Sequence, residues 1–308
     1  MHAHSIQRSG QLQAIAENNH VTRVDPRLGS YVRNKGKIGV EKISCKKVST
    51  FYGFCKRHDN ELFYPIDDFA LVPTEKQVML YSYRCLCREY FVKENGAMLV
   101  KNYLDNKVSL EPEFRSFALG MLSGFESLHF HKQEFDRSLS SKSYSDVMYV
   151  CFKSKDNWHT QFSGTLYPDY DFQGNKLQDL ASLDRLKEMI TFFTAPIDDG
   201  WAFVFAWHKS SNAVSSKLVS SLAKAMHRGE KVEDCLFRFS ISCCENHAFR
   251  TSWWDNLKDE TKSEILQTTE VMVDLETEVP ATYLAIGLNG VASWSFDRVC
   301  SNMSGLTC

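Results

Sequence analysis

The sequence has few of the residues that mark unstructured or repetitive chains. Its 308 residues include only 15 Gly and 7 Pro. Collagen-like repeats, low-complexity tracts and long flexible linkers are rich in these two residues. The composition therefore predicts a folded chain with short connections, and the length suits one large domain or two ordinary ones.

Long apolar runs are also missing. The longest clearly apolar run extends from Trp201 to Trp207, whereas a helix that crosses a bilayer needs about 20 apolar residues. The segment that begins at Met1 has none of the apolar character of a secretion signal. We therefore predict a cytoplasmic protein that has no membrane partner.

A regular cysteine framework is missing as well. The ten cysteines are irregularly spaced, at Cys45, Cys55, Cys85, Cys87, Cys151, Cys235, Cys243, Cys244, Cys300 and Cys308. A disulfide scaffold is expected in a shorter, secreted chain. We interpret most of these residues as small buried hydrophobic side chains.

What the chain does contain is a large apolar and aromatic fraction, with 43% apolar residues and 21 Phe, 12 Tyr and 6 Trp. In the N-terminal half the patterns indicate helices. One helix is predicted to begin at the N-cap Thr74, with Gln77 completing a capping box, and to stop near Gly96. A second helix is predicted from Pro112 to about Ser138.

From Val147 onward the patterns indicate strands and then helices. Strands are predicted over 147–152 and 160–166, and a hairpin is predicted over 189–193 and 201–207, turning at Asp198-Asp199-Gly200. Helices are expected over 213–226, 230–247 and 252–268, and a last strand over 281–288. The predicted fold class is α+β, with a helical N-terminal half and a C-terminal antiparallel sheet flanked by helices.

The serine-rich stretch Ser138–Ser145 is the predicted boundary between domains. We divide the chain into a weakly ordered basic arm over 1–30, a mainly helical domain over 31–140 and an α+β domain over 146–308. Residues 1–60 contain eleven Lys and Arg against four Asp and Glu, a net charge of +7, although the whole chain carries −2. A basic segment of this kind suits an anionic ligand, or simply forms a solvated arm.

A segment at the end of this basic region combines a thiol, an imidazole and a carboxylate: Gly53-Phe54-Cys55-Lys56-Arg57-His58-Asp59. The two residues between Cys55 and His58 give the spacing of a common zinc half-site. We therefore predict these two residues as ligands of zinc or another divalent metal. Further ligands are expected from Cys45 or from a second half-site, Cys243, Cys244 and His247.

The same segment supports other interpretations. Cys55 is a candidate thiolate nucleophile, activated by protonated His58 and oriented with help from an acid such as Asp67 or Asp68. His58 and Asp59 are candidate groups for general acid–base catalysis. The structural alternative is a turn anchored by aromatic residues, in which the Cys55 side chain is buried and His58 and Asp59 cap the next element.

Four cations near the segment form a predicted anion-binding site: Lys56, Arg57, Arg84 and Arg88. Arg84 and Arg88 are four residues apart on the predicted helix, so they repel each other unless an anion or an acid lies between them. The alternative is a solvated helix face.

The Gly-Phe-Cys-x-x-His-Asp core, followed by Phe63 and an acidic turn, resembles a segment of a group of uncharacterised bacterial proteins. Other parts of the chain are similar to the same group: Tyr83-Arg84, Glu89 to Lys93, Asp171 to Asn175, and Glu245-Asn246 with Trp253-Trp254. The resemblance implies a bacterial cytoplasmic protein. The chain has no Walker loop, dinucleotide-binding glycine pattern, nucleophile elbow or kinase motif.

Together these patterns predict a metal-assisted hydrolase that acts on a phosphodiester or nucleotide, as a nuclease-like bacterial effector. His58 and Asp59 are the predicted catalytic residues, and nucleic acid or a nucleotide is the predicted partner. The alternative is a non-enzymatic module that binds or regulates a protein partner and uses the Cys-x-x-His turn structurally. The acidic overall charge favours this alternative, because general nucleic-acid binders are usually basic.

Overall fold

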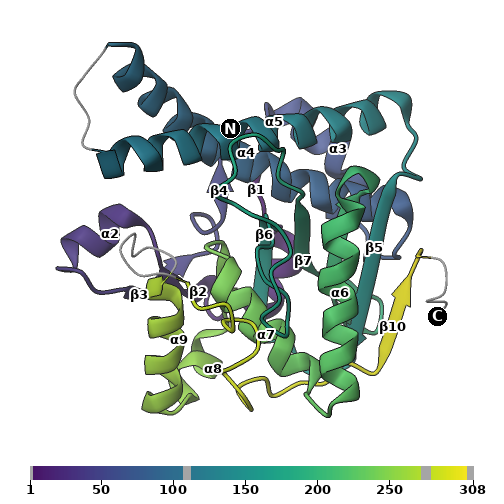
Figure 1. Cartoon of the computed structure of the whole chain (residues 1–308). Helices are drawn as coiled ribbons and strands as arrows, with labels where there is room; N and C mark the ends of the chain where they lie inside the picture. The colour runs from purple at the N-terminus through teal and green to yellow at the C-terminus, as the bar shows by residue number, and fades with distance from the viewer. Residues whose placement is uncertain (1–2, 107–111, 272–278, 304–308) are drawn as a thin grey trace.

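The computed structural model describes residues 3–106, 112–271 and 279–303. It confirms the α+β class: a large antiparallel sheet has helices on both of its faces (Figure 1). In spatial order the eight strands are β10 (Arg298–Ser301), β5 (Val147–Ser154), β8 (Gly200–His208), β7 (Ile190–Ile197), β6 (Thr160–Leu166), β9 (His247–Phe249), β2 (His20–Asp25) and β3 (Gly39–Ser44). A separate pair joins β1 (Ala3–His4) to β4 (Thr50–Phe51).

Side chains of the central strand β8 alternate between two cores, as the pleat of a strand requires. Its large residues lie in one core with α6 (Asn212–His227) and α7 (Val232–Cys243): Trp201, Phe203, Phe205 and Trp207. Its small residues lie in the other core, against α4 (Glu75–Asp105): Ala202, Val204 and Ala206. Small side chains on this face let the long helix pack close to the sheet.

The hairpin prediction is confirmed. Strands β7 and β8 pair from Thr191 with Ala206 to Ile197 with Gly200, so the turn consists of Asp198 and Asp199. Gly200 has φ +151°, and a Cβ at this position would collide with the carbonyl oxygen of Ser154. Only glycine meets both requirements at low cost.

The start of α4 is also confirmed, because the Thr74 side chain accepts a hydrogen bond from the backbone N–H of Gln77. The predicted stop at Gly96 is wrong, since the helix continues to Asp105. At Gly96 a Cβ would lie 2.8 Å from the Met121 Cε of α5 (Pro112–Ser141). Gly96 therefore lies next to α5 within a continuous helix instead of ending it.

Two predictions near the C-terminus are wrong. The helix expected over 252–268 is two helices, α8 (Thr251–Asn256) and α9 (Asp259–Val271), because Leu257 is extended. The strand expected over 281–288 is a series of turns. Arg238 donates hydrogen bonds to the carbonyls of Leu284 and Gly287 at 2.8 and 2.6 Å, which occupies acceptors that a strand would use.

The structure differs from the expectation for residues 1–30. Residues 3–25 contain β1, the π-helix Arg8–Leu12, α1 (Gln13–Ile15) and β2, and α2 (Leu28–Arg33) follows. Their apolar side chains are buried in the core around the sheet: Ile6, Leu12, Ile15, Val21 and Val24. The spacing of these residues matches no single helical or strand period, which explains why sequence patterns did not reveal them.

Among the helices of the described ranges, the longest are α4 and α5. Both have the length to cross a bilayer, yet none of the described helices joins that length to the hydropathy of a membrane span.

Candidate functional site

The Cys-x-x-His-Asp segment forms the start of a helix rather than a turn. Helix α3 spans Lys56–Asp67, and Cys55 is its N-cap residue with extended backbone angles. Because the first helical turn points most of these side chains outward, the residues from Cys55 to His58 are exposed. Asp59 alone among the segment's five polar residues is partly buried, on the side of α3 that faces the protein.

The inner side of α3 lines a polar cavity of about 280 Å³, which we call the Asp59 pocket. Its walls come from the N-terminal segment, from α3 and from α4: His4, Gln7, Arg8, Ser9, Asp59, Asp67 and Arg84. The fold holds the N-terminal segment here by two links. β1 pairs with β4 just before α3, and the Gln7 side-chain amide donates to the backbone carbonyl of Asp67 at 2.5 Å.

Arg84 is the most rigidly held group in the Asp59 pocket. Its two terminal nitrogens donate to the two carboxylate oxygens of Asp67 at 2.7 and 2.8 Å, the bidentate geometry that arginine prefers. Its guanidinium carbon lies 4.0 Å from the centre of the Phe63 ring. The side chain is 3% exposed, and its Nε has no hydrogen-bond partner among the described residues.

Asp59 is the least satisfied group in the pocket. Its Oδ1 is buried and has no hydrogen-bond partner among the described residues. Burial raises the pKa of the Asp59 carboxyl, Arg84 opposes this rise and Asp67 adds to it, so that the pKa lies above its usual value. Burial with a nearby carboxylate is the arrangement that tunes an acid toward proton transfer near neutral pH.

The N-terminal wall adds groups that the sequence did not point to. A ring nitrogen of His4 lies 3.0 Å from the Cys45 carbonyl oxygen, and Gln7 Oε1 accepts a hydrogen bond from the Gly10 N–H at 2.8 Å. Arg8 is exposed at the rim. These residues precede Asp59 by fifty positions or more, and their only sequence signal is their place in the basic N-terminal region.

Only part of the predicted anion site lines the pocket. Arg84 does so, whereas Arg88 lies one turn further along α4 and pairs with Glu89 at 3.5 Å. Lys56 and Arg57 are exposed on the outer side of α3, where Arg57 lies 4.0 Å from Glu61. The pair Arg84 and Arg88 therefore has separate acidic partners, Asp67 and Glu89, in place of a shared anion.

The predicted metal ligands do not assemble into a complete site. Cys55 and His58 supply two donors, and the described residues contain no group of three or more His, Cys, Asp or Glu that could hold a metal ion. In the predicted second half-site, His247 Nδ1–H donates to the Cys244 carbonyl at 2.9 Å, and its Nε2 accepts from the Val24 N–H at 3.3 Å. Both ring nitrogens of His247 are therefore already hydrogen-bonded, so this histidine is not free to bind a metal ion. Metal binding by Cys55 and His58 stays a prediction, and the described residues supply no third ligand for it.

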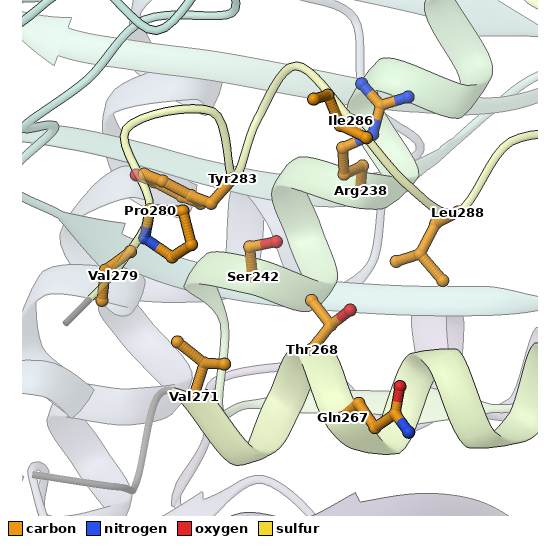
Figure 2. Close-up of a pocket in the computed structure, with 10 residues that line it drawn as sticks. All are labelled: Arg238, Ser242, Gln267, Thr268, Val271, Val279, Pro280, Tyr283, Ile286 and Leu288. Carbon is orange, nitrogen blue, oxygen red and sulfur yellow. The ribbon is translucent and has the colours of Figure 1, made fainter. Parts of the chain in front are cut away.

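A second cavity, of about 270 Å³, differs in character (Figure 2). It lies between α7, α9 and the segment over 279–288, and its walls are largely apolar. Its one charged residue, Arg238, donates to the two carbonyls described above and to Asn289 Oδ1 at 2.6 Å. The Asp59 pocket, by contrast, places two carboxylates beside two arginines, which makes it the candidate functional site.

Comparisons with protein-family models, with curated proteins and with solved structures found no match. The resemblance to bacterial proteins that share the Gly-Phe-Cys-x-x-His-Asp core therefore stays a prediction.

Proposed function

We propose that the protein hydrolyses a phosphodiester or nucleotide in the Asp59 pocket, with Asp59 as the general acid–base group. The buried Oδ1 of Asp59 carries this proposal: it has no hydrogen-bond donor among the described residues, and a carboxylate oxygen without a donor is available to a ligand. Arg8 and Arg84 line the same cavity, and arginine suits phosphate recognition.

Arg84 and Arg8 have different parts in this proposal. Asp67 and Phe63 hold the Arg84 guanidinium in one orientation beside Asp59. Its positive charge and its Nε–H, which has no acceptor among the described residues, therefore have a fixed position in the pocket. Such preorganised charge stabilises negative charge that develops on a phosphate. Arg8 lies exposed at the rim, where it would contact the rest of an anionic substrate.

Asp59 would take a proton from the attacking water. A carboxyl whose pKa is raised toward the working pH is a more effective base than an ordinary aspartate, and later returns the proton to the leaving oxygen. No step of this proposal passes through a metal ion. Zinc or another divalent metal at Cys55 and His58 remains a separate prediction.

A non-enzymatic protein-interaction module is the second candidate. The observation that favours it is a set of exposed apolar side chains at the end of α3 and just beyond it: Tyr64, Phe69 and Val72. The rings of Tyr64 and Phe69 contact edge to face, with centroids 5.4 Å apart. Exposed aromatic clusters are typical of protein-docking surfaces.

The substitution Asp59→Asn tests the proposed function. It keeps the shape of the side chain and removes the base, so we expect hydrolysis of bis(p-nitrophenyl) phosphate or of a short oligonucleotide to fall about 10²–10⁴-fold. Asp68→Asn is the matched control, because Asp68 is the exposed C-cap residue of the same helix. It should retain wild-type activity.

Binding of the same oligonucleotide separates the two candidate functions. A phosphate-binding pocket should lose affinity as salt rises, with a log–log slope of roughly 0.9 for each phosphate contacted in a duplex and about 0.7 in a single strand. Wild-type activity in the Asp59→Asn variant would disprove the role of Asp59. If the wild type neither hydrolyses nor binds these substrates at low salt, the interaction module becomes the better explanation.

A further inference from the structure

Cys151 and Cys300 face each other across the outermost strand pair of the large sheet. Cys151 lies in the middle of β5 and Cys300 in the edge strand β10, and the antiparallel register places them directly opposite. Opposed residues of antiparallel strands have Cα atoms about 4.5–5.5 Å apart. This separation falls within the range that a disulfide requires.

Both residues are free, buried thiols, and each influences the pKa of the other. The Cys151 thiol lowers the pKa of Cys300, burial opposes this effect and Lys153 adds to it, so that the pKa of Cys300 lies below its usual value. The Cys300 side chain and burial raise the pKa of Cys151. The pairing thus favours the thiolate form of Cys300 over that of Cys151.

The pair lies at the edge of the large sheet. Cys300 is 5% exposed and Cys151 is fully buried, yet β10 has only four residues and pairs with β5 alone. Short edge elements open locally at low free-energy cost, which admits a small molecule without unfolding the core. These two are the only cysteines that lie within strands of the described chain.

We propose that Cys151 and Cys300 are a redox-active pair that a low-molecular-weight disulfide converts into a cross-strand disulfide. The Cys300 thiolate attacks one sulfur of the reagent, forms a mixed disulfide and releases one thiolate. The Cys151 thiol gives up its proton and attacks the Cys300 sulfur, which forms the protein disulfide and releases the second thiol. Two protein thiols are oxidised and one reagent disulfide is reduced to two thiols.

Peptide mapping of the folded protein tests the proposal. The Cys308→Ser variant is incubated with oxidised glutathione, quenched in acid, alkylated and digested with trypsin. Cys308 is replaced because it belongs to the same tryptic peptide as Cys300. We expect peptide 143–153 linked to peptide 299–308, an intact mass lower by two hydrogens, and a melting temperature higher by about 5 °C or more. Dithiothreitol should reverse all three changes.

Two further variants act as controls. Cys300→Ser should abolish the link, whereas Cys235→Ser, which removes a buried cysteine elsewhere, should keep it. The mapping in the Cys308→Ser protein decides the question even if Cys300→Ser fails to fold. Reaction at the exposed Cys55 alone, or a link from Cys151 to any cysteine other than Cys300, would overturn the proposal.

Discussion

The two faces of α3 have different environments. The outer face carries the exposed Cys55 and His58, three residues apart. The inner face carries Asp59, Phe63, Ile66 and Asp67, whose spacing of four, three and one residues makes one helical stripe. The difference teaches that neighbouring residues of a motif can have unrelated environments, because each step along a helix turns the side chain by about 100°.

The largest effect on the inner face is expected from Arg84→Met. This change leaves Asp67 without its bidentate partner and removes the guanidinium from the Phe63 ring. Loss of one member of a buried ion pair typically costs about 3 kcal/mol, and urea denaturation should show a decrease of this size in the free energy of unfolding.

Arg88→Met on the same helix is the matched control, because the contact of Arg88 with Glu89 is longer, at 3.5 Å, and the Arg88 side chain is more exposed than that of Arg84. Its cost should stay below about 1 kcal/mol. Equal losses in the two variants would mean that the pair of Arg84 with Asp67 is not a special support of the Asp59 pocket.

The fold was more predictable than the site, for a physical reason. The cap at Thr74, the hairpin at Asp198-Asp199 and the strand Thr160–Leu166 depend on residues close in sequence, so local patterns reveal them. The Asp59 pocket joins His4 and Gln7 to Arg84 through the pairing of β1 with β4. No local pattern records a contact between segments so far apart.

Within the motif, sequence reasoning selected Asp59 but assigned it to a turn with His58. Treating 56–67 as a helix would have placed Asp59 on the same face as Phe63 and Ile66. Proline usually marks the end of a helix, yet α3 continues past Pro65 to Asp67.

We expect Asp59→Asn to change the stability of the fold less than Arg84→Met does. The direction of the change tests the environment of Asp59. The pKa of Asp59 is raised in the folded state, so the folded protein holds the proton more tightly than the unfolded chain does. The stability that this supplies is present below the unfolded pKa of about 3.9 and is lost as pH rises through the folded pKa. At neutral pH Asp59→Asn should therefore raise the melting temperature, and the gain should vanish in acid.

Asp25 provides the opposite case for the same substitution. Burial raises its pKa, but hydrogen bonds from Arg27 and Ser30 outweigh this and lower the pKa to about 2. The stability that the ionised Asp25 carboxylate supplies is fully present at a pH above the unfolded pKa, and it is lost as the pH falls toward 2. Asp25→Asn should then lower the melting temperature at neutral pH. If both variants shift the melt in the same direction, the contrast between a paired and an unpartnered carboxylate is wrong.

The smallest effect is expected on the outer face of α3. The Cys55→Ser/His58→Ala double variant replaces two exposed side chains, so the free energy of unfolding should change by no more than about 0.5 kcal/mol. Metal analysis of the purified wild type is measured beside the melt. If Cys55 and His58 bind zinc, the wild type should contain about one ion per chain and the double variant should lack it. The free energy of unfolding of the variant should then fall by clearly more than about 0.5 kcal/mol, because a structural zinc stabilises the folded state directly. A metal-free wild type with an unchanged melt in the variant would remove the predicted metal site, and the chemistry would then rest on the inner face of the helix alone.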